Sequence, residues 1–186
     1  MQIEEHWLQE ARHCPSPFYD ARPQAEISLL VIHNIALPPL TYGGTAIEQL
    51  FSGNLSSSAH PYFAQLEDLK VSAHLLIRRT GELVQFVAFN QRAWHAGASS
   101  FAGRTRCNDF AIGIEMEGSD MQPYTQPQYQ QLLRVSAALM RAYPAITLDR
   151  ICGHSHLAPE RKTDPGPAFN WHQYLHALQH LRGSVR

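Results

Sequence analysis

The run ISLLVIHN, at positions 27–34, constrains the fold more than any other stretch of the chain. It is continuously apolar, rich in β-branched residues and polar only at its end, which is typical of a buried strand. A strand without a polar side must be covered on both faces, as central strands of α/β sheets are. The chain is therefore expected to build a sheet with other elements packed on its faces.

Three further segments have strand character. Apolar runs flank Thr-Gly within residues 71–89, which predicts a hairpin with a tight turn. Residues 109–118 alternate, so one side of that strand is apolar and the other carries Glu115 and Glu117. A short strand is expected at 150–154.

Three segments have helical periodicity and cap signals. They are 45–53, with Thr45 and Glu48 as a capping box and Gly53 as its end; 125–144, with Thr125 and Gln128 as a capping box and Pro144 as its end; and 171–181, capped by Asn170.

Strands and helices interleave without a linker or a repeat, which indicates one domain spanning 1–186. The predicted fold class is α/β, with a mixed central β-sheet flanked by helices. Hydrophobic residues make up 44% of the chain, enough for a core that needs no disulfides. We expect residues 1–26 to form an irregular N-terminal wrap and 183–186 to fray.

Composition argues against several classes of partner and site. A net charge of −1 offers no basic field for nucleic acid. No apolar run is long enough for a membrane span, and the first residues lack the apolar segment of a signal peptide. The cysteines form no CxxC pair, which argues against a thiolate zinc site. We therefore expect reduced thiols and a cytoplasmic location.

Polar side chains end three of the predicted strands. His33 ends 27–34, His154 ends 150–154, and Glu115 lies near the end of 109–118. Ligands of α/β sheets usually bind at strand ends. The loop after His154 then brings Lys162 and Asp164 back over the same rim.

His33, His154 and Asp164 have the ligand chemistry of a catalytic zinc site with a free fourth position. The alternative for each histidine is a hydrogen-bonded core residue. Non-haem iron is the rival metal, although the order of the ligands along the chain favours zinc. His156 is an alternative ligand to His154, which we prefer because it follows the strand directly.

A hydrolytic metal site also needs a base and a cation. Glu115 is the first candidate for the base, because burial in an apolar strand raises a carboxyl pKa. Glu117 is the alternative on the same face, and we expect it to be more solvated. Lys162 is the candidate cation, and a solvated loop lysine is the alternative for it.

Several blocks of the chain together resemble a known family. They are CPSPFYDARP, LLVIHN, SAHLLI, RAWHAG, CNDFAIGIEMEG and GHSHLAPERKTDPGPAFNW. In this order they resemble the zinc N-acetylmuramoyl-L-alanine amidases, the superfamily of phage T7 lysozyme and the peptidoglycan recognition proteins. The likeness is greatest to the cytoplasmic AmpD-type 1,6-anhydro-N-acetylmuramoyl-L-alanine amidases, and it covers residues 14–171.

The resemblance implies one zinc ion held by His33, His154 and Asp164. It implies Glu115 as the acid–base carboxylate and Lys162 as the residue that stabilises the transition state. The reaction would be hydrolysis of the amide between the lactyl group of 1,6-anhydro-N-acetylmuramic acid and L-alanine, in cytoplasmic peptidoglycan recycling. The chain departs from the AmpD type after His154, where Ser155 and His156 replace the frequent Cys and Asp.

The resemblance also points to residues that would contact the substrate. They are Tyr62, Phe63, Trp94, His95, Arg106 and Asn108, with Arg104 as a less certain addition. Ordinary packing and solvation remain the alternative for each. The expected partner is a small anhydromuropeptide, with a monomeric enzyme and no obligate protein partner.

Two other functions are weighed against cytoplasmic catalysis. Some relatives bind peptidoglycan without cutting it, but they typically lack a metal ligand, whereas all three positions are filled here. An exported amidase that acts on intact wall would need the signal peptide that the first residues do not show.

Overall fold

The computed structural model describes residues 1–183. Of the tail expected to fray at 183–186, Gly183 is the last residue of a helix, and the remaining three residues lie outside the described part. Within that part, no helix combines the length and the apolarity that crossing a membrane requires.

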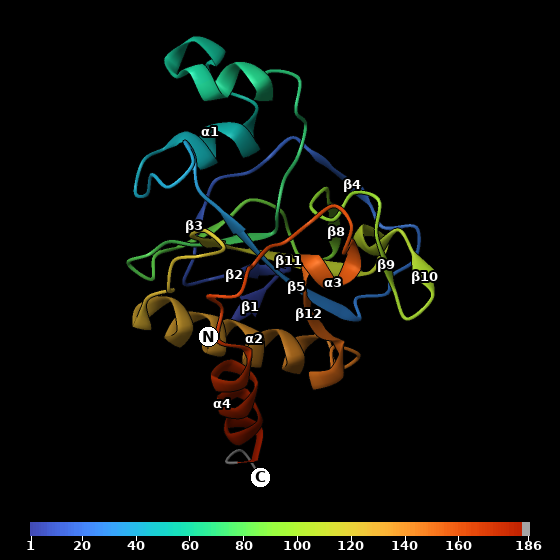
Figure 1. Cartoon of the computed structure of the whole chain (residues 1–186). Helices are drawn as coiled ribbons and strands as arrows, with labels where there is room; N and C mark the ends of the chain where they lie inside the picture. Colours follow the sequence, from blue (N-terminus) through green and yellow to red (C-terminus); the bar gives the residue numbers. More distant parts are fainter. Residues whose placement is uncertain (184–186) are drawn as a thin grey trace.

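A six-stranded mixed sheet forms the centre of the molecule, with parallel and antiparallel pairs (Figure 1). In spatial order its strands are β12 (Ile151–Gly153), β5 (Leu29–Ile35), β11 (Ala111–Glu117), β6 (Leu75–Ile77), β7 (Leu83–Gln85) and β3 (Arg12–His13). Among the described strand pairs of this sheet, only β6–β7 is antiparallel. The predicted fold class is therefore confirmed.

The predicted central strand is β5, which lies between β12 and β11 and is parallel to both. Its side chains from Leu29 to His33 are all buried. The hairpin predicted within 71–89 is β6 and β7, joined through Gly81, whose φ of +88° favours glycine.

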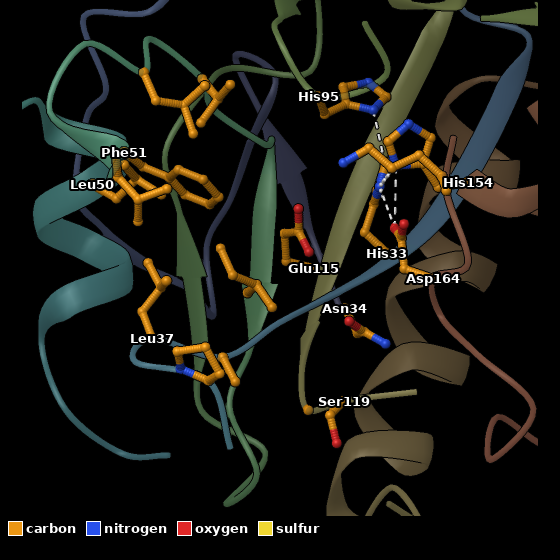
Figure 2. Close-up of a pocket in the computed structure, with 18 of the residues that line it drawn as sticks. His33, Asn34, Leu37, Leu50, Phe51, His95, Glu115, Ser119, His154 and Asp164 are labelled. Atoms are coloured by element: carbon orange, nitrogen blue, oxygen red, sulfur yellow. Dashed lines mark hydrogen bonds and ion pairs between the residues drawn. The ribbon is translucent and has the colours of Figure 1, made fainter. Parts of the chain in front are cut away.

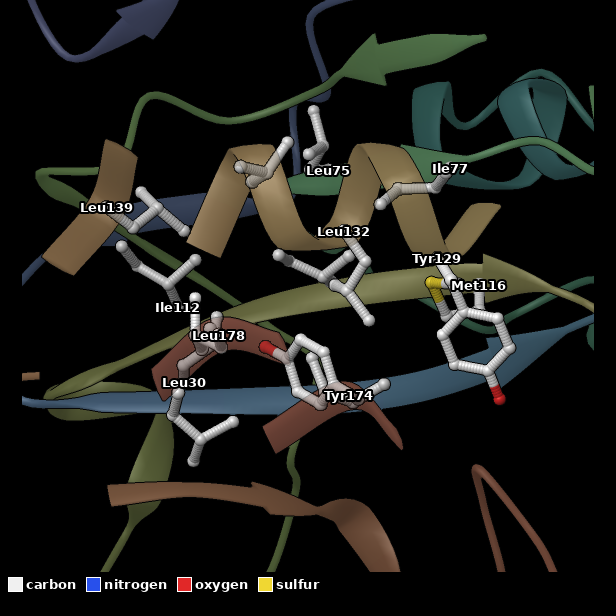
Figure 3. Packing of buried hydrophobic residues seen from close by; sticks show 14 of the residues in the cluster. Leu30, Leu75, Ile77, Ile112, Met116, Tyr129, Leu132, Leu139, Tyr174 and Leu178 are labelled. Carbon is white, nitrogen blue, oxygen red and sulfur yellow. The ribbon is translucent and has the colours of Figure 1, made fainter. Parts of the chain in front are cut away.

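Helices α2 (Gln126–Ala142) and α4 (Trp171–Gly183) cover one face of the sheet (Figure 1). Alternate strand residues such as Leu30, Ile112 and Met116 pack against Leu132 and Tyr174 on these helices (Figure 3). Leu132 is fully buried, so truncating it to alanine is expected to cost about 2–5 kcal/mol.

The opposite face is covered in two separate places. Over β6 and β7 lies a lobe built from α1 (Ala46–Ser52), η1 (Ser57–Ala59) and η2 (Pro61–Leu66). A smaller apolar cluster, which includes Val31, Phe110 and Cys152, covers β5, β11 and β12 nearer their amino ends. The carboxyl ends of β5 and β11 hold polar side chains instead, and these line a cavity.

Three short two-stranded pairs complete the fold: β1 (Ile3–Glu4) with β2 (Trp7–Leu8), β4 (Tyr19–Ala21) with β8 (Gln91–Ala93), and β9 (Ser100–Phe101) with β10 (Arg104–Thr105). Residues 1–26 are thus less irregular than predicted, since they contribute β1 to β4. The difference arises because strand pairing is made by backbone groups. β3 pairs with β7 in the main sheet, and the side chains of this segment show no alternation that would predict the pairing.

The cap predictions differ in outcome. The capping box of α2 and the cap of α4, where Asn170 accepts from the backbone of Gln173, are confirmed. The capping box of α1 is wrong, because Thr45 has helical backbone angles and its side chain makes no cap hydrogen bond. Glu48 is instead bonded to Arg12 and Arg78.

Candidate active site

The register of three parallel strands brings the predicted polar residues to one edge of the sheet. Glu115 of β11 lies directly beside His33 of β5. Gly153 of β12 lies beside Ile32, so the next residue, His154, reaches the level of His33. Side chains from distant parts of the sequence meet because parallel strands end at the same edge.

His33, His154 and Asp164 form a compact cluster (Figure 2). The Nδ1 atoms of the two histidines are 3.0 Å apart, and they lie 3.1 and 3.2 Å from Oδ2 of Asp164. Gly153 lets the loop that carries Asp164 approach closely, because a Cβ there would lie 2.7 Å from Cδ of Pro165.

The hydrogen bonds around this cluster indicate a site for a cation. Nε2 of His154 lies 3.0 Å from the backbone oxygen of Ala96, which can only accept, so Nε2 carries a proton and donates it. Nδ1 of the same ring faces Nδ1 of His33 and the carboxylate of Asp164. Burial lowers the pKa of His33 to about 4, which keeps the His33 ring neutral.

These three residues fit zinc. Ligand atoms around tetrahedral zinc lie about 3.3 Å apart for bonds of about 2.0–2.2 Å, close to the separations within the cluster. Imidazole nitrogen and carboxylate oxygen are suitable ligands, and three of them leave the fourth position for another group. A hydrogen bond from His154 to the Ala96 carbonyl is the type of outer contact that orients metal-binding histidines.

His156, the alternative ligand, does not reach the cluster. Its side chain is exposed and lies beside the ring of Phe101, with centroids 6.0 Å apart. His154 starts the short helix α3 (His154–Leu157), whose first turn directs the two histidines to different sides.

Glu115 is buried beside the cluster without a protein partner for one of its oxygens. Its Oε2 has no hydrogen bond to any residue of the described part of the chain. Burial, followed by the charge of Asp164, raises the pKa of Glu115 well above its ordinary value, against the lowering effect of Lys162. The carboxyl of Glu115 therefore keeps its proton to a higher pH than an ordinary glutamate does, which suits a group that must both accept and donate a proton.

Glu117 differs from our expectation, because it is drier than Glu115, with 1% against 8% of its surface exposed. Its oxygens accept hydrogen bonds from the backbone of Gly43 and Arg79 at 2.7 and 3.0 Å, and from Arg78 at 3.0 Å. These contacts commit its lone pairs to the fold, which leaves Glu115 as the carboxylate available for proton transfer.

The cluster opens into a cavity of about 940 Å³. The predicted site residues that line it are His33, Tyr62, Trp94, His95, Asn108, Glu115, His154, Lys162 and Asp164. Within this group, Asn108 also supports the loop, since its Oδ1 accepts from the backbone of His95 and Ala96 at 3.2 and 2.8 Å.

Other predicted contact residues do not line the cavity. Phe63 is buried in the apolar lobe with α1. Arg106 points to solvent and pairs with Asp109, while Arg104 pairs with Glu26. Contact of these three residues with a substrate stays a prediction that this geometry does not support.

Sequence reasoning missed part of the cavity wall. Figure 2 shows an apolar side that includes Leu37, Leu50 and Phe51, with Glu115 between this wall and the cluster of His33, His154 and Asp164. It also shows Asn34, whose side chain donates to Asp120 at 2.8 Å. The position of Asn34 directly after His33 is the one sequence signal that could have identified it.

Comparison with known proteins gives a consistent result. The model of a family described as N-acetylmuramoyl-L-alanine amidase matches residues 23–167. The 1,6-anhydro-N-acetylmuramyl-L-alanine amidase AmpD of Citrobacter freundii is 58% identical over 175 residues, which cover 94% of this chain and 93% of that protein.

Solved structures agree in fold. The crystal structure of a selenomethionine derivative of AmpD matches with a TM-score of 0.93 and 57% identity, over 95% of this chain and 99% of that one. The Escherichia coli amidase AmiD, in complex with the substrate anhydro-N-acetylmuramic acid-L-Ala-D-gamma-Glu-L-Lys, matches with a TM-score of 0.61 and 28% identity, over 85% and 60%.

Proposed function

The chain belongs to the N-acetylmuramoyl-L-alanine amidase family, and we propose that it is a zinc-dependent 1,6-anhydro-N-acetylmuramoyl-L-alanine amidase of cytoplasmic peptidoglycan recycling. It cleaves the amide between the lactyl group of the anhydro sugar and L-alanine. The observation that carries the proposal is the convergence of two imidazoles and two carboxylates on one cavity, in a chain more than half identical to AmpD amidases.

His33, His154 and Asp164 would hold the zinc ion. Bound there, zinc acts as a Lewis acid toward the scissile carbonyl. Burial lowers the pKa of His33, so its neutral imidazole offers a lone pair to a cation, while Asp164 offers a carboxylate oxygen. The burial of His33 and His154 keeps bulk water from their ring nitrogens, which strengthens the charge interactions of the site.

Glu115 supplies the proton transfer. Its unpartnered Oε2 takes a proton from the attacking water and delivers it to the nitrogen of L-alanine as the amide breaks. The raised pKa suits both halves of this task, since the group must accept a proton and then give it up.

Lys162 lies in the cavity wall two residues before Asp164. Its ammonium group stabilises the negative charge that develops on the carbonyl oxygen. A rigid loop supports this placement, because the backbone N–H of Lys162 donates to the oxygen of Ala158 at 2.9 Å.

The cavity has the size of a small-molecule site, and its mixture of apolar and polar walls suits a sugar with a short peptide. We infer that the enzyme acts as a monomer on a soluble anhydromuropeptide, without an obligate protein partner. Tyr62 and Trp94 would supply the apolar contacts for this substrate.

Mass spectrometry tests the proposal. The protein is stripped with a chelator, reloaded with zinc, and offered either an anhydromuropeptide or intact peptidoglycan. We expect release of the free stem peptide from the anhydromuropeptide, its loss on stripping and its return with zinc. Full activity of the stripped protein would refute the metal dependence, and binding without cleavage would favour a recognition module. Preferential cleavage of intact peptidoglycan would refute the recycling role.

A further inference from the structure

His95 contacts His33, one of the three candidate zinc ligands, from outside their cluster. Its Nδ1 lies 2.9 Å from Nε2 of His33, on the side of that ring away from Asp164. Its own Nε2 is buried and has no hydrogen-bond partner among residues 1–183. The ring also lines the cavity.

The fold makes specific room for this imidazole. A Cβ at Gly113 of β11 would lie 2.5 Å from both Cγ and Nδ1 of His95, so the ring rests directly on the strand where a side chain is missing. His74 lies beside it, with ring centroids 5.7 Å apart. The N–H of Gly113 donates to Nδ1 of His74, whose proton is therefore on Nε2, bonded to the oxygen of Gln91.

The contact between the two rings suits a His33 that binds a metal through Nδ1. A neutral imidazole that ligates through Nδ1 carries its proton on Nε2. In His33 this proton would point at Nδ1 of His95, 2.9 Å away, which accepts it when the proton of His95 is on its own Nε2.

We propose that His95 is the positioning residue that holds His33 in the tautomer that metal binding through Nδ1 requires. The inference rests on the proposed zinc site and adds to it an outer contact that orients one of the three ligands.

Two substitutions separate the two nitrogens of His95. His95→Asn keeps an acceptor near the position of Nδ1 and loses the donor at Nε2. His95→Gln places its amide near the position of Nε2 and loses the acceptor for His33. His172→Gln, on the exposed side of α4, is the matched control for loss of an imidazole.

Zinc affinity, measured by competition with a chromogenic chelator, is expected to fall about 10- to 100-fold in His95→Gln. His95→Asn should retain an affinity near that of the wild type, because its amide oxygen can still accept from Nε2 of His33. Equal zinc affinity in both variants and the wild type would overturn the inference.

Nitrogen-15 spectra of the wild-type histidine rings provide a test that does not depend on variants. In the zinc-loaded protein the proton of His33 should lie on Nε2, and the proton of His95 should also lie on Nε2. A proton on Nδ1 of His95 in the zinc-loaded protein would overturn the inference alone. A protein that binds no zinc would overturn it together with the proposed function.

Discussion

Glu115 and Glu117 are two residues apart on β11 and both are buried, yet the structure predicts opposite consequences when each is changed to glutamine. Glu117 accepts three hydrogen bonds, one of them in an ion pair with Arg78. Glu115 has an oxygen without any partner in the described chain.

The cost of Glu117→Gln follows from its contacts. Breaking a buried ion pair costs about 3–5 kcal/mol. The amide oxygen can keep the bonds from Gly43 and Arg78, but the amide nitrogen then faces the N–H of Arg79, donor against donor. Arg78 retains its pair with Glu48, so we expect the lower end of that range, about 3 kcal/mol of unfolding free energy.

Glu115→Gln removes no protein hydrogen bond at Oε2 and relieves a desolvated charge. Its unfolding free energy should therefore equal or exceed that of the wild type near neutral pH. Its turnover should fall about 100- to 10,000-fold, as expected for the loss of a general acid–base group.

Urea unfolding followed by tryptophan fluorescence measures the first effect, and peptide release by mass spectrometry the second. For a slope of about 2 kcal/mol per molar urea, Glu117→Gln should shift the midpoint down by about 1.5 M. A stable Glu117→Gln protein would refute the assignment of that carboxylate to the fold. Near wild-type turnover in Glu115→Gln would refute its role as the base.

Three further predictions concern the metal, the cation and pH. Asp164→Ala should lower bound zinc, measured by atomic emission on the purified protein, whereas full metal content would exclude this carboxylate as a ligand. Lys162→Met should reduce kcat about 100- to 1,000-fold at unchanged zinc content, and a change confined to KM would contradict its role toward the oxyanion. The pKa of Glu115 is raised on folding, so above about pH 4.5 the unfolded state binds fewer protons than the folded state. The free energy of unfolding of the metal-free wild type should therefore fall with rising pH relative to that of Glu115→Gln. Parallel curves for the two proteins would contradict the raised pKa.

Much of the fold could be derived from local patterns. The continuous apolar run that became β5, the hairpin around Gly81 and the α2 capping box each depend on residues close in sequence. Where a polar side chain had a choice of partners, local reasoning failed. Glu48 bonds to Arg12 and Arg78 from other segments rather than capping its own helix.

The identity of the candidate metal ligands was also accessible, because His33 and His154 end strands and Asp164 returns on a loop. Their role as ligands stays a prediction that the zinc measurements test. The solvation of Glu117 was misjudged, since alternation along a strand tells which face a residue occupies but not what covers that face. Helices cover one face of β11 and other segments cover the opposite face, so its carboxylates are buried on a side that pattern alone assigns to solvent.

The sequence by itself therefore determined the layered α/β architecture and the set of residues able to bind a metal, since both follow from short-range periodicity and from side-chain chemistry. Only the tertiary structure decided how these residues differ in role. Strand register set His33 beside Glu115, and the missing side chain at Gly113 admitted His95 to the far side of His33. Such contacts join segments far apart in the chain, and their protonation states depend on burial and on partners that no local pattern specifies.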